Sequence, residues 1–260
     1  MNKRKKWNDT FAGSLSEGLI PIALILVVWF WVVGSGNVNT VVLPTPKMVW
    51  GTFVAKFTTG VLLKELLVSL RRVLEGYFLS AALGIGLGIL VGLSNHARKL
   101  TEIIIQVIRP IPPIAWIPLV ILWMGIGEGS KVFLIFLGGF FTNLINVSDG
   151  IRYTDVKLLE VAKVLEAPKF KVITKVIIPA ALPNIFTGLR VSLGSCWTCV
   201  VAAELVASTS GIGYMISNAR NYGQMDVVIV GMLAIGIIGK LMDIILKKIE
   251  TKVLAWNGTT

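Results

Sequence analysis

Long apolar runs, separated by short charged segments, constrain the fold of this chain more than any other feature. A helix needs about 20 mostly apolar residues to cross the roughly 30 Å hydrocarbon core of a bilayer, and several runs reach that length. Of the 260 residues, 55% are hydrophobic and only 15% are charged, and the mean hydropathy is +0.79. An ordinary soluble domain does not have this composition. The sequence therefore predicts an all-α membrane protein that crosses the bilayer several times.

Six transmembrane helices are predicted, at residues 19–35, 76–94, 103–124, 131–148, 182–207 and 227–246. They form one domain over residues 19–250, which follows a cytoplasmic N-terminal segment (1–18) and precedes a C-terminal tail (251–260). The first apolar run comes after four basic residues and has no small-residue cleavage site behind it, which favours a membrane anchor over a removed signal peptide.

The distribution of Lys and Arg predicts the orientation in the membrane. With the N-terminus inside, the predicted inner side holds 15 of these residues and the outer side holds seven. Cytoplasmic loops carry the excess of basic residues in membrane proteins. Both termini and the segment 152–181 are therefore expected in the cytoplasm. The net charge of +11 does not predict a nucleic-acid partner, because the basic residues lie at segment ends and in short loops.

The segment 152–181 is amphipathic and unlike its apolar neighbours. Leu158, Val161, Ala162 and Leu165 recur at helical spacing, with charged residues on the other faces. Pro168 disfavours helical geometry at the preceding residue, so the helix should break there, and a second short helix should start with this proline in its first turn. Such a bent pair is suited to gripping a partner protein, although the pattern alone also fits a helix lying on the membrane surface.

Two spans carry signals of special packing. Gly84, Gly88 and Gly92 place a small residue at every fourth position, which indicates close helix packing within the subunit. Residues 109–113 read Arg-Pro-Ile-Pro-Pro, which should kink or interrupt the third span. Interrupted backbone is tolerated in a bilayer only where it is buried in protein or lines a water-filled cavity.

Charged and thiol side chains within the spans are candidates for function. Glu204 is an intramembrane carboxylate, which indicates a functional site, although bonding to nearby backbone or service in a gate is an equal alternative. Arg109 and Arg190 could contact a solute or extend to the membrane surface. Asp243 follows Lys240 by three residues, which favours a local ion pair. The two cysteines, at positions 196 and 199, are interpreted as buried apolar residues rather than metal ligands.

Several stretches resemble the permease subunits of bacterial ATP-binding-cassette (ABC) importers. Glu160-Val161-Ala162, Glu166 and the run 176–179 (VIIP) resemble the cytoplasmic EAA loop of these permeases. Between about residues 40 and 220, further stretches are similar to the nitrate, sulfonate and taurine branch of that family: LPTPKMVW, SLRRVLEGYFLSAALGIGLGILVGLS, IRPIPPIAWIPLVILWMGIGEGSKVF, LPNIFTGLRVSLG, and VAAEL followed by SGIGYMI.

The resemblance implies a type I importer permease with six helices. Its partners would be a second permease subunit, most simply another copy, two cytoplasmic ATPase subunits, an extracytoplasmic substrate-binding protein and the lipid bilayer of the cell membrane. Contact with the ATPase would fall on the coupling residues Glu160, Ala162, Lys163, Leu165, Glu166, Pro168 and Pro179. The solute path is expected to include Arg109, Pro112, Pro113, Trp116, Arg190 and Glu204. The chain departs from the family pattern at Val161, where alanine is usual, and at Glu166, where glycine permits a turn.

The function that follows is transport driven by ATP hydrolysis elsewhere. The sequence contains no Gly-x-x-x-x-Gly-Lys-Ser/Thr loop for ATP phosphates, so no catalytic, cofactor or metal site is expected in this chain. The branch resemblance implies a small anion such as an aliphatic sulfonate, taurine or nitrate. Two alternatives stay open: the same machinery for a thiamine precursor or riboflavin, and a secondary carrier driven by an ion gradient.

Overall fold

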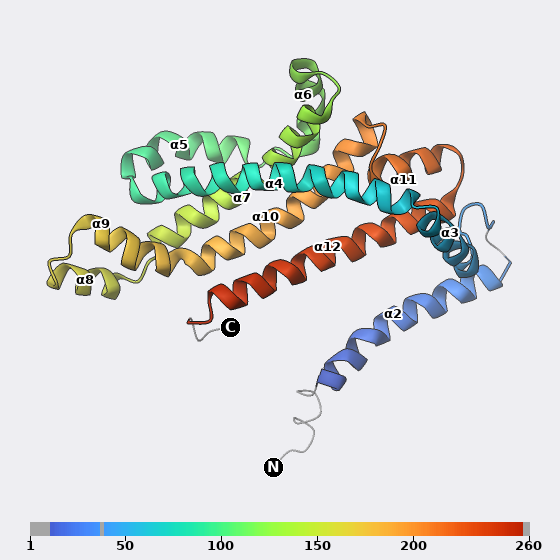
Figure 1. The fold of residues 1–260 in the computed structure, drawn as a ribbon, viewed down its shortest axis with the longest axis horizontal. Coiled ribbons are helices and arrows are strands. Elements are labelled where there is room, and N and C mark those ends of the chain that lie inside the picture. The colour runs from blue at the N-terminus through green and yellow to red at the C-terminus, as the bar shows by residue number, and fades with distance from the viewer. Residues whose placement is uncertain (1–10, 37–38, 257–260) are drawn as a thin grey trace, which may run out of the picture.

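The computed structural model describes residues 11–36 and 39–256, and these residues form helices and no strand. The helices are α2 (Phe11–Gly34), α3 (Pro46–Thr58), α4 (Val61–Leu93), α5 (Asn95–Ile108), the 3₁₀ helix η1 (Pro113–Trp116), α6 (Ile117–Met124), α7 (Glu128–Arg152), α8 (Val156–Val164), α9 (Lys169–Val172), the π-helical turn η2 (Ile173–Ile177), α10 (Ile178–Ala207), α11 (Ile212–Asn221) and α12 (Met225–Val253). Figure 1 shows α4, α7, α10 and α12 running alongside one another, with α8 and α9 at one end of the bundle and α3 and α11 at the other.

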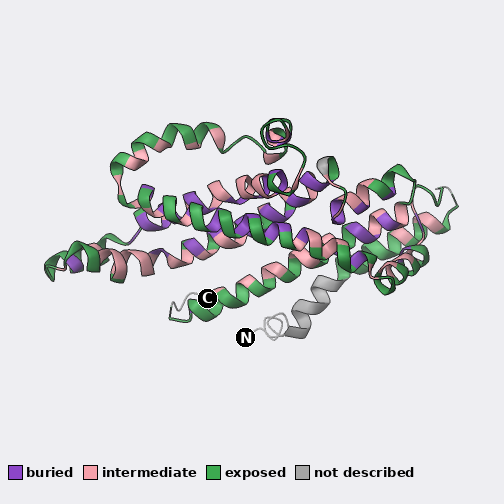
Figure 2. Cartoon of the chain, turned by 45° about the horizontal axis from the view of Figure 1, so that its top comes forward, coloured by how far each residue is buried: buried purple, intermediate pink, exposed green. Residues whose placement is uncertain are grey.

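The core of the bundle is α7, which packs between α4 and α10. Glycines of α4 allow the close approach: a Cβ on Gly84 would lie 2.6 Å from the Cβ of Asn143, and one on Gly88 would lie 2.8 Å from the carbonyl oxygen of Leu144. Real Cβ atoms do not come this close, so a larger residue would push α4 and α7 apart. The predicted role of the glycine series in packing within the subunit is confirmed. Burial is accordingly concentrated along α4, α7 and α10 (Figure 2).

Four helical stretches among the described residues are long and apolar enough to cross a membrane: Val61–Leu93, Glu128–Arg152, Lys169–Val206 and Met225–Val253. A fifth candidate is the pair α5 and η1–α6, which bends by 87° between Ile108 and Pro113. The predicted interruption of the third span is therefore confirmed. The remaining candidate, Ile20–Gly34, is a shorter apolar helix, so the predicted number of six is reached only if this helix also crosses.

The helix that carries the second predicted span begins 15 residues before the predicted start of that span. The sequence predicted the span from residue 76, whereas α4 runs unbroken from Val61 to Leu93. A helix of 33 residues is about 50 Å long, which exceeds the hydrocarbon thickness of a bilayer. The other long helices also extend past their predicted ends, to Arg152 in α7 and to Val253 in α12.

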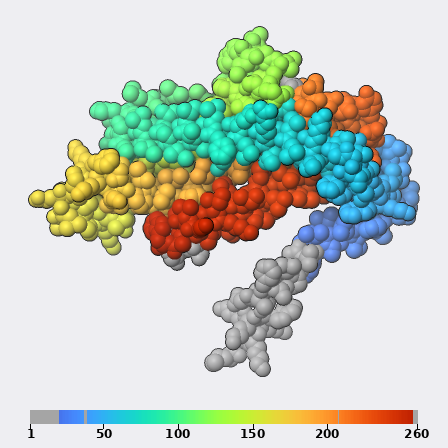
Figure 3. All heavy atoms as spheres, in the orientation of Figure 1, coloured from blue at the N-terminus to red at the C-terminus, as the bar shows by residue number. Residues whose placement is uncertain are grey.

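The helix α2 lies at the edge of the bundle and approaches it at its C-terminal end (Figures 1 and 3). There the Trp29 indole Nε1 donates to the Pro44 carbonyl oxygen at 3.1 Å, and the ring packs against the core cluster that includes Val49 and Leu62. Residues 11–18, predicted as part of a cytoplasmic segment, begin this helix. Residues 1–10, which carry the four basic residues of that segment, lie outside the described residues.

Candidate functional site

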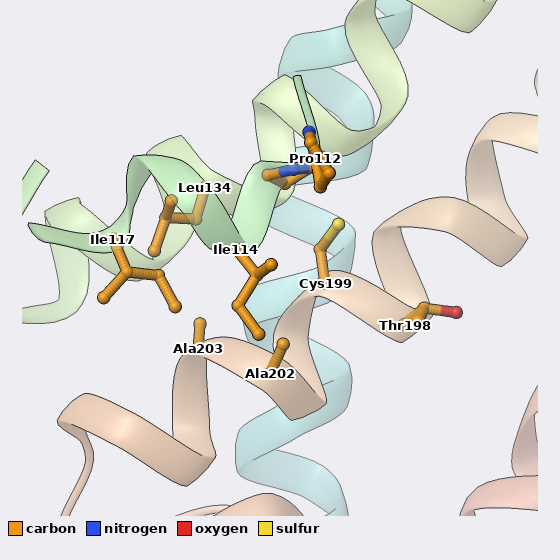
Figure 4. A pocket seen from close by; sticks show the side chains of 9 residues that line it. Pro112, Ile114, Ile117, Leu134, Thr198, Cys199, Ala202 and Ala203 are labelled. Carbon is orange, nitrogen blue, oxygen red and sulfur yellow. The ribbon is translucent and has the colours of Figure 1, made fainter. Parts of the chain in front are cut away.

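Three pockets lie in a row along one side of α7. The first has a volume of about 260 Å³ and is almost wholly apolar; its lining residues are Pro112, Pro113, Ile114, Ile117, Leu134, Thr198, Cys199, Ala202 and Ala203. Figure 4 shows side chains from the broken α5–η1–α6 segment and from α10 turned toward this space. α5 ends at Ile108, and Pro110, Pro112 and Pro113 prevent the helix from continuing, so the chain bends by 87° into η1 and α6 beside this pocket.

The second and third pockets continue the row. The second, of about 160 Å³, shares Pro113 with the first and adds Trp116 and Thr142. The third, of about 190 Å³, shares Arg109 with the second and is lined mainly by polar residues of α5 and α7, including Arg98 and Arg152. The row therefore changes from apolar at the first pocket to charged at the third.

The row follows one stripe of α7. Six of the ten α7 residues at the pockets are spaced by three or four, as the centre of one helix face requires: Leu134, Gly138, Phe141, Ile145, Ser148 and Arg152. The other four lie on either side of this stripe: Leu137, Thr142, Leu144 and Asp149. From Leu134 to Arg152 the helix rises about 27 Å, at 1.5 Å per residue. This length is close to the roughly 30 Å thickness of the hydrocarbon core.

The structure brings together four of the six residues predicted to line a path: Arg109, Pro112, Pro113 and Trp116. Arg190 lies elsewhere, because its guanidinium pairs with Asp243 at 3.0 Å and Glu250 at 3.1 Å, both on α12. It lines a separate pocket between α10 and α12. The predicted pair of Lys240 and Asp243 is confirmed, with 3.6 Å between charged atoms.

Glu204 lies in a buried network instead of facing the row of pockets. It is 1% exposed, and both carboxylate oxygens accept hydrogen bonds from the Ser69 hydroxyl, at 2.8 and 2.9 Å. The backbone N–H of Gly213 donates to it at 2.9 Å, and Arg72 Nη1 donates at 2.7 Å. The alternative in which Glu204 bonds neighbouring groups therefore fits the geometry, and the residue joins α10 to α4 and α11.

Arg72 holds this network together. All five N–H groups of its guanidinium are used, since it binds Glu204, both oxygens of Glu128 at 2.6 and 2.7 Å, and the carbonyl and hydroxyl oxygens of Ser210. The side chain is only 3% exposed. Four segments are thus tied to one buried cation: α4, the first turn of α7, the end of α10 and the loop before α11.

The sequence interpretation missed this role of Arg72, which was counted only among the basic residues of the outer side. A signal was nevertheless present, because Glu65, Ser69 and Arg72 are spaced by four and three residues and so share one helix face. In the structure Ser69 and Arg72 bind Glu204, and Glu65 accepts from the backbone N–H of Gly211 at 2.5 Å. A polar stripe of this kind indicates a helix whose partner is also polar.

The segment between α7 and α10 forms an elbow at the opposite end of the bundle from this network (Figure 1). Its first helix, α8, ends at Val164 with a Schellman motif: the N–H of Ala167 donates to the carbonyl of Ala162, and that of Glu166 donates to the carbonyl of Lys163, both at 3.0 Å. Glu166 has φ +50°, the only positive φ of a non-glycine residue in residues 11–36 and 39–256. The turn that glycine permits in the family is therefore made here by a glutamate in the left-handed conformation.

The prediction that Pro168 lies in the first turn of the second helix was wrong. The first helix ends three residues earlier than expected, at Val164, and Pro168 is the N-cap residue of α9 with extended ψ of 144°. The second helix is also not short, because α9 continues through the π-helical turn η2 into α10. Pro179 lies in the first turn of α10, directly after η2; it lacks the N–H that a regular helix would need, which accounts for the widened turn before it.

The elbow exposes large apolar side chains. Val164 is 83% exposed, Leu165 73% and Phe170 76%, and we call these three residues the coupling patch. Glu160 and Lys163 are exposed beside it, whereas Ala162 is buried. Exposed apolar clusters of this kind mark contact surfaces for other proteins or membranes. Ala162 therefore supports the fold of the elbow, and the coupling patch is the part that a partner can reach.

Replacing Glu166 with glycine is expected to stabilise the turn by about 1 kcal/mol, because glycine adopts the left-handed conformation without the clash of a Cβ. The N–H of Ala167 should then exchange with solvent about fivefold more slowly in hydrogen exchange. The matched control is Glu160→Gly, which makes the same substitution inside α8 and should destabilise that helix by a similar amount. Faster exchange in Glu166→Gly would contradict this reading of the turn.

Comparisons with known proteins agree with this arrangement. The model of the family described as "Binding-protein-dependent transport system inner membrane component" matches residues 84–255. A protein of Bacillus subtilis (strain 168) named as an aliphatic sulfonates transport permease is 43% identical over 243 residues, which cover 94% of this chain and 88% of the relative. The taurine transport system permease protein TauC of Escherichia coli (strain K12) is 34% identical over 262 residues, 99% of this chain and 95% of the relative.

A similar fold occurs among solved structures. An inward-facing form of the MetNI methionine ABC transporter contains a chain that superposes with a TM-score of 0.65 at 18% sequence identity. The match covers 75% of this chain and 97% of that chain. The two chains therefore share a fold over the aligned part.

Proposed function

This chain belongs to the family of binding-protein-dependent transport system inner membrane components and is an ABC transporter permease; from that premise we propose that it forms the membrane route for a small anion. The observation that carries the proposal is the row of three pockets along α7. The row is about as long as the hydrocarbon core is thick, and it ends at Arg152, the last residue of α7. The elbow begins directly after this residue, so movement of the elbow would act on the end of the route.

A second permease subunit, most simply another copy of this chain, would close the route. The row of pockets lies beside the α5–α6 segment, and α6 projects from the bundle (Figures 1 and 3). Leu122 is 78% exposed there, Trp123 62% and Ile126 76%. Such side chains need lipid or protein around them. A second subunit placed against this face would bury them and enclose the pockets between the two halves.

The energy would come from two cytoplasmic ATPase subunits, each docked on an elbow. The coupling patch offers apolar contacts, with Glu160 and Lys163 beside it, while Glu166, Pro168 and Pro179 set the shape of the bend. In this arrangement the chain has no ATPase site of its own. ATP-driven closure of the ATPases would shift the permease between an outward-open and an inward-open state. A binding protein outside the cell membrane would deliver the solute, and both termini would face the cytoplasm.

The proposed solute is an aliphatic sulfonate, taurine or a similar small anion such as nitrate. Relatives named for sulfonates and taurine support this choice, as does Arg109, which lies where the second and third pockets meet. Guanidinium groups bind such oxyanions with paired hydrogen bonds. A specific observation favours a second candidate: the first pocket is apolar enough for an aromatic ring, as in a thiamine precursor or riboflavin.

Uptake by the reconstituted transporter tests the proposal. Vesicles that contain this chain with the ATPase and the binding protein of the same transporter should accumulate radiolabelled taurine or an alkanesulfonate only when ATP is supplied on the cytoplasmic side. Collapse of the proton gradient should leave the rate unchanged. Uptake that stops when the gradient collapses and needs no ATP would overturn the proposal in favour of a secondary carrier.

A further inference from the structure

The third pocket has features that transport along α7 does not by itself require. It lies between the polar face of α5 and the last turns of α7. Three arginines line it: Arg98 near the start of α5, Arg109 at its C-cap, and Arg152 at the end of α7. Two acidic residues, Glu102 and Asp149, line it as well. The pocket therefore holds one more positive than negative charge.

None of these three arginines forms a salt bridge within 4.0 Å with a residue that the structure describes. This contrasts with Arg72 and Arg190, each of which binds two carboxylates. The Arg98 Nε atom is in addition buried without a hydrogen-bond partner. Buried polar groups are nearly always paired, so an unpartnered guanidinium N–H beside a pocket indicates a ligand or ordered water there.

The two faces of α5 differ in polarity, and the polar face lines the pocket. The residues of α5 on the opposite face from the pocket are apolar and exposed: Leu100, Ile103, Ile104 and Val107. A helix that directs its apolar face outward and its polar face inward is typical of a membrane segment beside a water-filled cavity. Thr101, Gln106 and Ser148 add neutral hydrogen-bonding side chains around the arginines. The pocket is therefore wet, positive and lined with donors, unlike the apolar first pocket.

We propose that the third pocket is an oxyanion-binding site, in which the arginines Arg98, Arg109 and Arg152 hold the transported anion before it leaves to the cytoplasm. The inference rests on the proposed function and adds to it a place where the solute pauses. Guanidinium groups match the geometry of sulfonate, carboxylate and phosphate oxygens. The anion leaves the apolar first pocket, which cannot hold it, and gains charged hydrogen bonds at the third. Opening of the elbow next to Arg152 then exposes the site to the cytoplasm.

The test is the rate at which a cysteine in the pocket reacts with charged reagents. The complex with its ATPase subunits is placed in phosphatidylcholine nanodiscs, and carries Thr101→Cys together with Cys196→Ala and Cys199→Ala. An anionic, sulfonate-bearing thiosulfonate reagent should modify the cysteine roughly tenfold faster than its trimethylammonium counterpart, since local potentials of several kT concentrate ions of opposite charge. Methanesulfonate should slow the reaction, and choline should not.

Two substitutions on α5 provide the comparison. Arg98→Gln should remove most of the preference for the anionic reagent and the protection by methanesulfonate. Lys99→Gln removes the same charge from the same helix, but Lys99 is exposed and does not line the pocket, so both effects should persist. Co-purification of the ATPase with each variant shows that the variant is folded. If the ATPase does not co-purify with Arg98→Gln, the variant Arg152→Gln is used in its place. Equal rates for the two reagents, or an unchanged preference in the arginine variant, would overturn the proposal.

A lipid headgroup could supply the same oxyanion chemistry, and a second set of nanodiscs distinguishes this source. If phosphatidylglycerol protects the cysteine while methanesulfonate does not, the pocket binds a headgroup phosphate. The proposal that it holds the transported anion is then ruled out. Protection by methanesulfonate in both lipids supports the proposal. ATP-driven uptake is measured separately in vesicles. If uptake occurs but methanesulfonate does not protect the cysteine, the oxyanion site is refuted and the proposed transport function is not.

Discussion

Replacing Arg72 with methionine is expected to destabilise the protein by about 3–5 kcal/mol, because it leaves the Glu204 carboxylate buried without its cation. Glu204 would keep only the Ser69 hydroxyl and the Gly213 N–H. The carbonyl of Ser210 would also lose a donor. The midpoint of thermal unfolding in detergent should fall by on the order of 10 °C, and the loss should be visible as a smaller yield of folded protein.

The adjacent residue provides a matched control. Arg71 is 81% exposed and pairs with Glu75 on the surface of the same helix. Arg71→Met should change stability by less than about 1 kcal/mol, because exposed ion pairs contribute little. Similar losses in the two variants would contradict the buried role of Arg72 and point to a general effect of removing an arginine from α4.

A double variant tests the pairing itself. Arg72→Met combined with Glu204→Leu removes both buried charges and should recover part of the stability that the single substitution loses. Glu128 would not become a buried, unpaired charge in the double variant, because its side chain is 61% exposed and still accepts a hydrogen bond from Lys131 Nζ at 2.8 Å. Additive losses would mean that Arg72 and Glu204 act independently.

Local signals in the sequence predicted the features that depend on local chemistry. The prolines at 110, 112 and 113 predicted the break after α5, because a proline acts on its own turn of helix. The spacing of Gly84, Gly88 and Gly92 predicted a close helix contact. It did not identify α7 as the partner, since this requires knowledge of which helices are neighbours.

Features that depend on distant residues could not be read in the same way. Arg72 and Glu204 are 132 residues apart, and nothing in either neighbourhood specifies the other. The polar residues Glu65, Ser69 and Arg72 also lowered the local hydropathy, so the predicted span began only at residue 76. The structure shows that this part of α4 is polar because it faces a polar partner, while its helical spacing is intact.

The family resemblance indicated the position of the turn in the elbow correctly, whereas the residue expected to make this turn was wrong. The family pattern has glycine where this chain has Glu166, and Pro168 was expected to make the bend instead. In the structure Glu166 itself adopts the left-handed conformation, and Pro168 begins the next helix as its N-cap. The backbone requirement at that position is therefore the same as for glycine. A Schellman motif explains why, since its C′ residue has positive φ whatever the side chain.

Removing two side chains of the coupling patch is expected to abolish ATP-driven uptake without affecting the folding of the permease. In the variant Leu165→Asn, Phe170→Asn, each apolar side chain becomes a short polar one at a position that is more than 70% exposed, so the fold loses little. If these residues fill pockets of the ATPase, their loss should cost 2 kcal/mol or more of binding free energy, or on the order of a 30-fold weaker complex. The ATPase should no longer co-purify with the variant, and uptake should be lost. The midpoint of thermal unfolding should stay within about 2 °C of that of the parent.

The control for this variant lies in the last two turns of α12, which end on the same side of the bundle as the elbow (Figure 1). Ile249 is 47% exposed and Val253 is 44% exposed, and both lie outside the elbow. Replacing both with asparagine removes exposed apolar surface on the same side of the bundle, and should leave ATPase binding intact. If the elbow variant binds the ATPase as tightly as this control does, the elbow does not receive the driving force. If both variants lose the ATPase, the contact extends beyond the coupling patch to α12.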